Sequence, residues 1–423
     1  MTMRVDTVVI GAGQAGLNVS RALQMVDVDH VVLERGRIGE TWATQRWESF
    51  RLNTPNWANG LLGWDYDGPD PDGFMSATEL RGRMIAFVER FELPIRENAA
   101  VTRVGRRRGE FEVATSDGDV RRCRNVVVCS GAQNVPRTPP IADQIRGVAH
   151  VHAAEYRRPD QLADGGVLVV GGAQTGAQLA EELAAAGRDT YLSTSDVGSV
   201  PRRYRGRDIG RWMLDIGVVH TPVESLDDPS KKYATQPLMT GVDRGHTLTL
   251  HGLARRGVAL LGRLRDADGN RLRFDDDLAD HAARSLASIT EFCSNVDRFV
   301  AGTGIEAPPP EIDDALQIAP EIDDMCRELE LDLVERGIGT VIWATGFRGD
   351  FAYLDVGLVT DDHGVPVHHS GASDVEGLWF CGFPWLRIQS SGLIYGSGVD
   401  ARAIVDEIVS TNAVRSWPAQ SSV

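Results

Sequence analysis

The chain has 423 residues, of which 42% are hydrophobic and 25% charged, a composition typical of a globular protein long enough for two domains. Its formal net charge of −16 repels nucleic acid and anionic lipid, so neither is an expected partner. Five scattered cysteines without CxxC spacing argue against a disulfide framework and a metal site. Since no apolar run approaches membrane-spanning length and the sequence opens in a strand, we expect no membrane and a cytoplasmic protein.

Residues 5–34 predict a strand, a glycine turn, a helix and a second strand. Gly11, Gly13 and Gly16 have GxGxxG spacing, which permits a tight turn, close approach of a pyrophosphate and close packing of the helix. Glu34 ends the second strand, where a carboxylate can accept hydrogen bonds from ribose hydroxyls. The unit therefore predicts a dinucleotide site, whose further members are Gln14, Ala15 and Arg35.

The same unit recurs at residues 167–193, where Ala173 replaces the central glycine. The position equivalent to Glu34 is Ser193, so no carboxylate there repels a 2′-phosphate. Arg202 and Arg203 follow, and guanidinium groups suit phosphate geometry, although solvated surface arginines are the alternative. We therefore assign FAD to the first site and NADPH to the second, whose expected members also include Gly171, Gln174, Thr175, Gly176 and Thr194.

The rest of the chain predicts how these two units are joined. Strands are expected at 111–114 and 126–128 before the second unit, and at 341–343 and 378–380 after it, followed by a closing helix at 401–408. The expected fold is therefore α/β, with two Rossmann-like dinucleotide-binding domains, the second inserted into the first. Residues 1–155 and 336–423 would form the FAD domain, and residues 156–335 the NADPH-binding and substrate-side domain.

Further segments carry a family resemblance: Gly39-Glu40-Thr41-Trp42, Cys129-Ser130-Gly131, Ala344-Thr345-Gly346, and the set Gly147, His152, Tyr156 and Arg157. Together with the glycine turns they resemble the class B flavin-dependent monooxygenases, which include flavin-containing, N-hydroxylating and Baeyer–Villiger enzymes. Glu40 stands where the family has a second glycine. Ile145 stands where its fingerprint has phenylalanine, and the gap from Gly147 to His152 is one residue longer, which argues mildly against a strict Baeyer–Villiger enzyme.

The resemblance implies a mechanism. NADPH reduces FAD, the reduced flavin forms a C4a-hydroperoxyflavin with O2, and a small molecule takes the oxygen at nitrogen, sulfur or an aromatic carbon. Asn53 would lie at the junction of flavin, nicotinamide and oxygen, while Arg51 and Arg387 could keep a peroxide anionic for Baeyer–Villiger chemistry. The cofactor-binding residues implied in this way are Thr41, Trp42, Asn53, Tyr156, Gln389 and Ser391.

Several alternatives stay open. Asn53 also suits a turn before Thr-Pro, and His152 suits a structural hinge as well as a catalytic role. The tryptophans Trp42, Trp47, Trp57 and Trp64 fit core packing or an aromatic substrate pocket. The alternative enzymes are an NADPH-dependent flavin reductase or dehydrogenase that passes electrons to a partner, and a Baeyer–Villiger monooxygenase. A flavin-bound redox sensor is the non-enzymatic alternative. A disulfide reductase is set aside, because no cysteine pair has suitable spacing. The sequence does not name the substrate, and a homodimer is only the commonest default.

Overall fold

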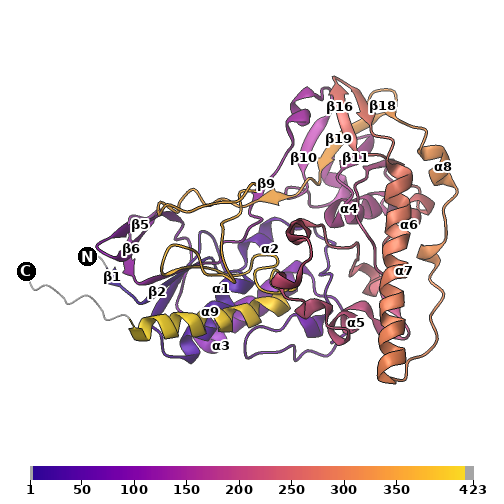
Figure 1. Ribbon diagram of the computed structural model, residues 1–423. Helices are drawn as coiled ribbons and strands as arrows, with labels where there is room; N and C mark the ends of the chain where they lie inside the picture. The colour runs from indigo at the N-terminus through magenta and orange to yellow at the C-terminus, as the bar shows by residue number, and fades with distance from the viewer. Residues whose placement is uncertain (1–2, 415–423) are drawn as a thin grey trace, which may run out of the picture.

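The computed structural model describes residues 3–414, which form two lobes, each around a five-stranded parallel sheet (Figure 1). The first sheet lies beneath α1 (Gln14–Met25), which packs against α9 (Ile394–Val414) and α3 (Ala77–Phe91). All four residues of its central strand are buried, as expected for a parallel sheet covered on both faces. In spatial order its strands are β21 (Leu378–Phe380), β8 (Asn125–Val128), β2 (Thr7–Ile10), β3 (His30–Leu33) and β4 (Ile95–Arg96).

The second parallel sheet contains β11 (Gly166–Val170), which is followed by the helix α4 (Gln174–Ala185). The long helix α7 (Leu278–Thr303) stands along the outer side of this lobe in Figure 1. Shorter helices, α6 (Leu250–Arg255) and α8 (Glu321–Met325), pack near β15. In spatial order the strands are β10 (Ala149–His152), β19 (Ile338–Trp343), β11 (Gly166–Val170), β12 (Thr190–Ser193) and β15 (Ala259–Leu261).

Each lobe also carries a smaller sheet, which is mixed in the first lobe, where β1 and β7 pair in parallel, and antiparallel in the second. The first lobe carries a four-stranded sheet, and the second a three-stranded one. The strands of the former are β1 (Met3–Arg4), β7 (Val120–Cys123), β6 (Glu110–Thr115) and β5 (Val101–Arg107). Those of the latter are β16 (Leu264–Asp268), β17 (Arg271–Phe274) and β18 (Glu330–Asp332).

The chain passes between the lobes at a two-stranded antiparallel ribbon made of β9 (Val135–Pro136) and β20 (Phe347–Arg348). Figure 1 shows β9 at the junction of the two lobes. The expected inserted topology is therefore present. Against the expected boundaries after residues 155 and 335, however, β10 and β19 both belong to the second sheet, so the crossings lie closer to the ribbon. Residues 415–423 of the expected last segment lie outside the described residues.

Residues 218–239, which we call the strap, follow α5 (Ile209–Asp215) in the inserted segment but lie on the first lobe. The strap contains three short 3-10 helices, and Pro222 forms an isolated bridge with Ile388. The backbone N–H of Val223 donates to Arg387 O at 2.9 Å, and that of Gln389 donates to Thr221 O at 2.9 Å. The first part of the strap is thus held against residues 387–389 of the first lobe.

The tryptophans divide between the two expected roles. Trp47 is buried, with its ring 5.0 Å from that of Phe50, and Trp64 stacks on Phe87 in the same core. Trp57 instead lines a cavity, with the Arg211 guanidinium 3.8 Å from its ring centroid. Among residues 3–414 no helix is both long and apolar enough to span a membrane.

Candidate functional site

The first glycine turn fits a pyrophosphate. Gly11 has φ of +103°, and a Cβ there would lie 2.7 Å from the carbonyl oxygen of Cys129. A Cβ on Gly16 would lie 1.8 Å from the carbonyl oxygen of Gly11, so helix and strand need glycine at both positions. A Cβ on Gly13 would meet nothing within 4 Å. The turn is therefore closely packed behind Gly13 and open in front of it, where a dinucleotide phosphate approaches the helix N-terminus.

The open side of this turn is a cavity of about 340 Å³. Glu34, at the end of β3, accepts hydrogen bonds from the backbone N–H of Ala12 at 2.7 Å and of Gly36 at 2.9 Å. Trp42 donates from Nε1 to Gln14 at 3.3 Å. The predicted residues that line this cavity are Gly11, Gly13, Gln14, Ala15, Glu34, Arg35, Thr41 and Trp42. This donor set and the glycine turn fit an FAD.

Arg46 also lines this cavity, and motif matching missed it. Its guanidinium lies 4.9 Å from the ring centroid of Trp42 and 5.4 Å from that of Phe50. Burial lowers the pKa of Arg46 to about 10. Among the described residues no carboxylate forms an ion pair with Arg46, so the charge is free to face an anionic ligand. In the sequence, Arg46 is marked only by its position between Trp42 and Trp47, and no motif selects an arginine there.

The second glycine turn repeats the first. A Cβ on Gly171 would lie 2.6 Å from Ala344 O, and one on Gly176 would lie 1.7 Å from Gly171 O. Ala173 has φ −77° and ψ −172°, close to the φ −83° and ψ −174° of Gly13. Both are ordinary extended conformations for an L-residue, so the alanine at this position costs no backbone strain. The turn and the N-terminus of α4 fit a second dinucleotide.

The side chains expected to select a 2′-phosphate form hydrogen bonds to other groups of the protein. The Ser193 hydroxyl donates to Gly262 O at 3.0 Å, and the Thr194 hydroxyl bonds Leu261 O at 2.8 Å and His281 Nδ1 at 2.9 Å. Arg203 is exposed and donates to backbone oxygens of the loop at 244–245. Their roles toward NADPH stay predictions.

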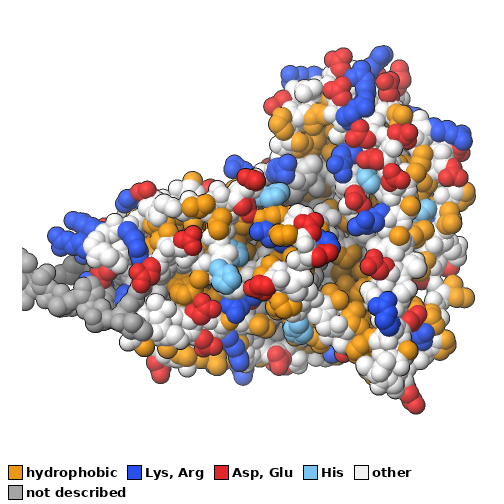
Figure 2. All heavy atoms as spheres, in the orientation of Figure 1, with side chains coloured by type: hydrophobic (Ala, Val, Ile, Leu, Met, Phe, Trp, Pro, Cys, Tyr) orange, Lys and Arg blue, Asp and Glu red, His pale blue; other side chains and the backbone are white. Residues whose placement is uncertain are grey.

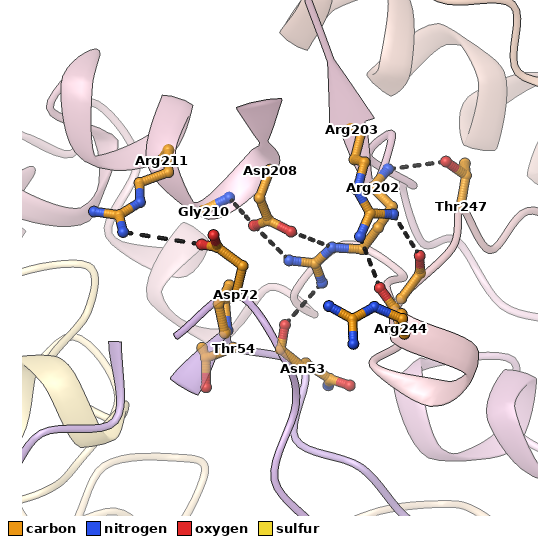
Figure 3. Close-up of polar contacts among 12 residues, drawn as sticks. Asn53, Thr54, Asp72, Arg202, Arg203, Asp208, Gly210, Arg211, Arg244 and Thr247 are labelled. Carbon is orange, nitrogen blue, oxygen red and sulfur yellow. Dashed lines mark hydrogen bonds and ion pairs between the residues drawn. The ribbon is translucent and has the colours of Figure 1, made fainter. Parts of the chain in front are cut away.

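Arg202 forms a buried junction between the lobes (Figure 3). Its side chain is 2% exposed, and it donates to both carboxylate oxygens of Asp208, at 2.8 and 2.6 Å. It also donates to the backbone oxygen of Asn53 at 2.8 Å and lies 4.6 Å from the ring centroid of Phe74. Asn53 Oδ1 accepts from Gln178 on α4 at 2.8 Å. Arg202 therefore ties the segment carrying Asn53 to the second lobe.

A larger cavity of about 910 Å³ opens between the lobes, under the strap. On the face of the molecule drawn in Figure 2, hydrophobic side chains gather in the middle, with charged side chains around and among them. The amide of Gln174 donates to Met239 O and its oxygen accepts from Met239 N at 3.1 Å, which fixes the end of the strap to the start of α4. The predicted residues that line this cavity are Asn53, Gln174, Arg202 and Gln389.

The other predicted residues line neither cavity. They are Gly16, Arg51, Tyr156, Gly171, Thr175, Gly176, Ser193, Thr194, Arg203, Arg387 and Ser391. The glycines serve backbone packing. Arg387 pairs with Glu407 at 3.2 Å, and Ser391 Oγ accepts from the backbone N–H of Arg387 and Ile388 at 3.1 and 3.0 Å. Of the three predicted catalytic residues, Asn53 therefore lines one of these two cavities, and Arg51 and Arg387 line neither.

His152 and Tyr156 both lie inside the fold. His152 Nδ1 accepts from Ala154 N at 3.1 Å and Nε2 contacts Gly346 O at 3.2 Å, next to the ribbon. Both ring nitrogens are thus used locally, and burial lowers the pKa of His152, as suits a neutral hinge residue. Tyr156 is fully buried near Glu182 of α4, and burial raises its pKa.

Two cysteines that are 252 residues apart come together beside the smaller cavity. Cys129 follows β8 and Cys381 follows β21, which pair in parallel, so sequence spacing gave no sign of this contact. Hydrogen bonding to Cys129 and burial raise the pKa of the Cys381 thiol. Disulfide exchange requires a thiolate, and this environment disfavours one.

Comparison with known proteins agrees with this geometry. Residues 8–205 match the family model described as pyridine nucleotide-disulphide oxidoreductase. The oxidoreductase CzcO of Bacillus velezensis is 30% identical over 406 residues, covering 95% of this chain and 99% of that protein. A flavin-containing monooxygenase from Stenotrophomonas maltophilia superposes with a TM-score of 0.67 at 21% identity, covering 97% of this chain and 100% of the other. A structure of OTEMO in complex with FAD and NADP gives a TM-score of 0.55 at 15% identity, covering 98% and 87%.

The fold is the two-domain α/β fold of the class B flavin-dependent monooxygenases, as expected from the sequence. The chain belongs to the CzcO family of oxidoreductases.

Proposed function

We propose that the protein is an FAD-dependent, NADPH-using monooxygenase that oxygenates a small molecule at nitrogen, sulfur or an aromatic carbon. One observation carries the proposal. The cavity at the first dinucleotide turn and the larger cavity that reaches the second turn share Ala132, Gln133 and Pro384 in their walls. A flavin held at the first turn therefore borders the space that a nicotinamide and a substrate would share.

Bound FAD would accept a hydride from NADPH and activate O2 as a C4a-hydroperoxyflavin. The protein itself would position the cofactors and the substrate and exclude water from the site. The strap covers the larger cavity, and Asn53 presents a neutral amide at its wall. His368, in the same wall, is kept uncharged because burial lowers its pKa to about 4. A largely apolar wall suits oxygen transfer to a soft nucleophile better than acid–base hydrolysis.

Three alternative functions have less support from these observations. Baeyer–Villiger oxygenation assisted by Arg51 or Arg387 lacks support, because neither residue lines the cavity. Disulfide reduction requires a thiolate, and hydrogen bonding to Cys129 and burial, which raise the pKa of Cys381, disfavour one at Cys381. A reductase that passes electrons to a partner protein has no specific observation in its favour. A cytoplasmic location and a homodimer stay predictions.

The proposal is tested by accounting for electrons and oxygen. FAD-reconstituted protein is supplied with NADPH, ¹⁸O2 and a panel of amines, sulfides and aromatic acids, and NADPH consumption, hydrogen peroxide release and product mass are measured together. Monooxygenation predicts one ¹⁸O atom in product for each NADPH consumed beyond the peroxide released. NADPH consumption that yields only peroxide with every compound, and rises with an added electron acceptor, contradicts it and favours a reductase.

A further inference from the structure

Two arginines project from one face of the ribbon that joins the lobes. In the antiparallel ladder Val135 lies opposite Arg348, and Arg137 donates its backbone N–H to Gly346 O at 3.0 Å. Opposed residues of such a ladder share a face, and so do residues two apart along one strand. Arg137 and Arg348 are therefore diagonal neighbours, with Cα atoms about 7–8 Å apart.

Neither guanidinium is neutralised by the protein. Among residues 3–414, no carboxylate lies within 4.0 Å of Arg137 or Arg348, and neither side chain has a hydrogen-bond partner in the chain. Both residues are exposed and line the larger cavity. Two like charges on one face repel each other, and a shared anion relieves that repulsion. Arg202, the third arginine of this wall, differs because Asp208 neutralises it.

Two carboxylates of the described chain line the cavity, and the contacts of both lie away from the ribbon. Asp361 accepts from the Tyr233 hydroxyl of the strap and from the backbone N–H of His363 and Val365, at 2.9 and 3.0 Å. It also lies 3.9 Å from Lys232. Glu224 accepts from Ser370 at 3.4 Å. Among the described residues, neither carboxylate of this wall forms an ion pair with Arg137 or Arg348.

We propose that Arg137 and Arg348 together bind the carboxylate of the substrate, so that the enzyme acts on small apolar or aromatic carboxylic acids. The proposal rests on the proposed function, since it takes the larger cavity as the substrate site. Apolar side chains line the remainder of this cavity and match the uncharged end of such a molecule. They include Trp57, Met213, Leu214, Val219, Phe383 and Leu386.

A phosphate of NADPH is the other anion that could reach this pair, because Ala173 and Gln174 at the start of α4 line the same cavity. Binding measurements separate the two sources. Oxidised, FAD-reconstituted protein is titrated with indole-3-acetate, phenylacetate and 4-methylvalerate, and with the amide of each acid, by calorimetry and by the change in flavin absorbance. NADP⁺ is titrated in parallel. The proteins compared are the wild type, Arg137→Gln, Arg348→Gln and, as a matched control, Arg298→Gln on the exposed surface of α7.

At least one acid should bind the wild type about tenfold more tightly than its amide, since a charge-assisted contact is lost in the amide. Each ribbon variant should lose most of that preference, while NADP⁺ affinity stays within about twofold and Arg298→Gln behaves as the wild type. No preference for any acid over its amide overturns the proposal. A tenfold loss of NADP⁺ affinity with acid binding unchanged also overturns it and assigns the pair to the coenzyme. Because no turnover is needed, the outcome stands whether or not oxygen transfer is found.

Discussion

The buried ion pair between Arg202 and Asp208 gives the sharpest prediction for stability. Asp208→Asn removes the negative charge but keeps a side-chain oxygen that can still cap α5, where Asp208 now accepts from Gly210 N at 2.8 Å. The cost therefore comes from the guanidinium, which stays buried at 2% exposure without a counter-charge. Removing one partner of a buried pair costs about 3–5 kcal/mol. We expect about 3 kcal/mol, because Arg202 keeps its bond to Asn53 O and its contact with Phe74.

A matched control lies at the other end of α5, about two helix turns away. Asp215 pairs with Arg207 at 2.8 Å, but the two side chains are 35% and 39% exposed. Asp215→Asn is the same chemical change at a similar distance, and an exposed pair contributes about 0–1 kcal/mol. Urea unfolding of both variants, followed by tryptophan fluorescence, measures the difference. A loss below about 1 kcal/mol in Asp208→Asn, or equal losses in both variants, would refute the argument from burial.

Three further predictions concern the cofactor site and pH. Gly16→Ala should abolish FAD retention and soluble expression, because its Cβ would lie 1.8 Å from Gly11 O, whereas Gly13→Ala should fold normally and only weaken FAD binding. Flavin absorbance per protein after gel filtration distinguishes the two. Arg46→Gln should weaken FAD binding about tenfold without changing the melting temperature of the apoprotein, since its charge faces the cavity; an unchanged flavin dissociation constant would count against this role. Burial lowers the pKa of His368 to about 4, below its unfolded value of about 6.5, so the unfolded state gains the proton first and stability falls as pH drops from 6.5 toward 4. His368→Gln should reduce that fall by roughly 1–2 kcal/mol at pH 5, measured by thermal unfolding across pH, and an identical pH profile would contradict it.

Local patterns predicted the parts of the fold whose cause is local. The apolar run before Gly11 and the glycine spacing after it each depend on a few neighbouring residues, and both glycine turns occur where expected. The return of the chain to the first sheet at β21 followed from a second apolar run late in the sequence. The exact place where the chain crosses between the sheets did not follow, because β10 joins the second sheet only by pairing with β19, nearly 200 residues later.

The side-chain partners in the site were not accessible from the sequence. Arg202 looked like a free phosphate ligand, but its burial results from packing between segments of both lobes. A Cβ on Gly241 would lie 2.1 Å from Leu52 O, and one on Gly245 would lie 2.8 Å from Arg202 Cδ, so these glycines let the two segments meet. The strap has no hydrophobic periodicity from which its position could be predicted. The roles of Asn53 in catalysis and of Arg203 toward NADPH stay predictions.

Stopped-flow absorbance tests the central claim most directly. The FAD-containing protein is reduced anaerobically with NADPH and mixed with oxygenated buffer, and the flavin spectrum is followed. We predict a transient oxygenated-flavin band in the wild type and in Asn295→Ala, a control on α7, and a band at least about tenfold shorter-lived in Asn53→Ala. Direct return to oxidised flavin with no transient, with NADP⁺ still bound, would contradict a monooxygenase.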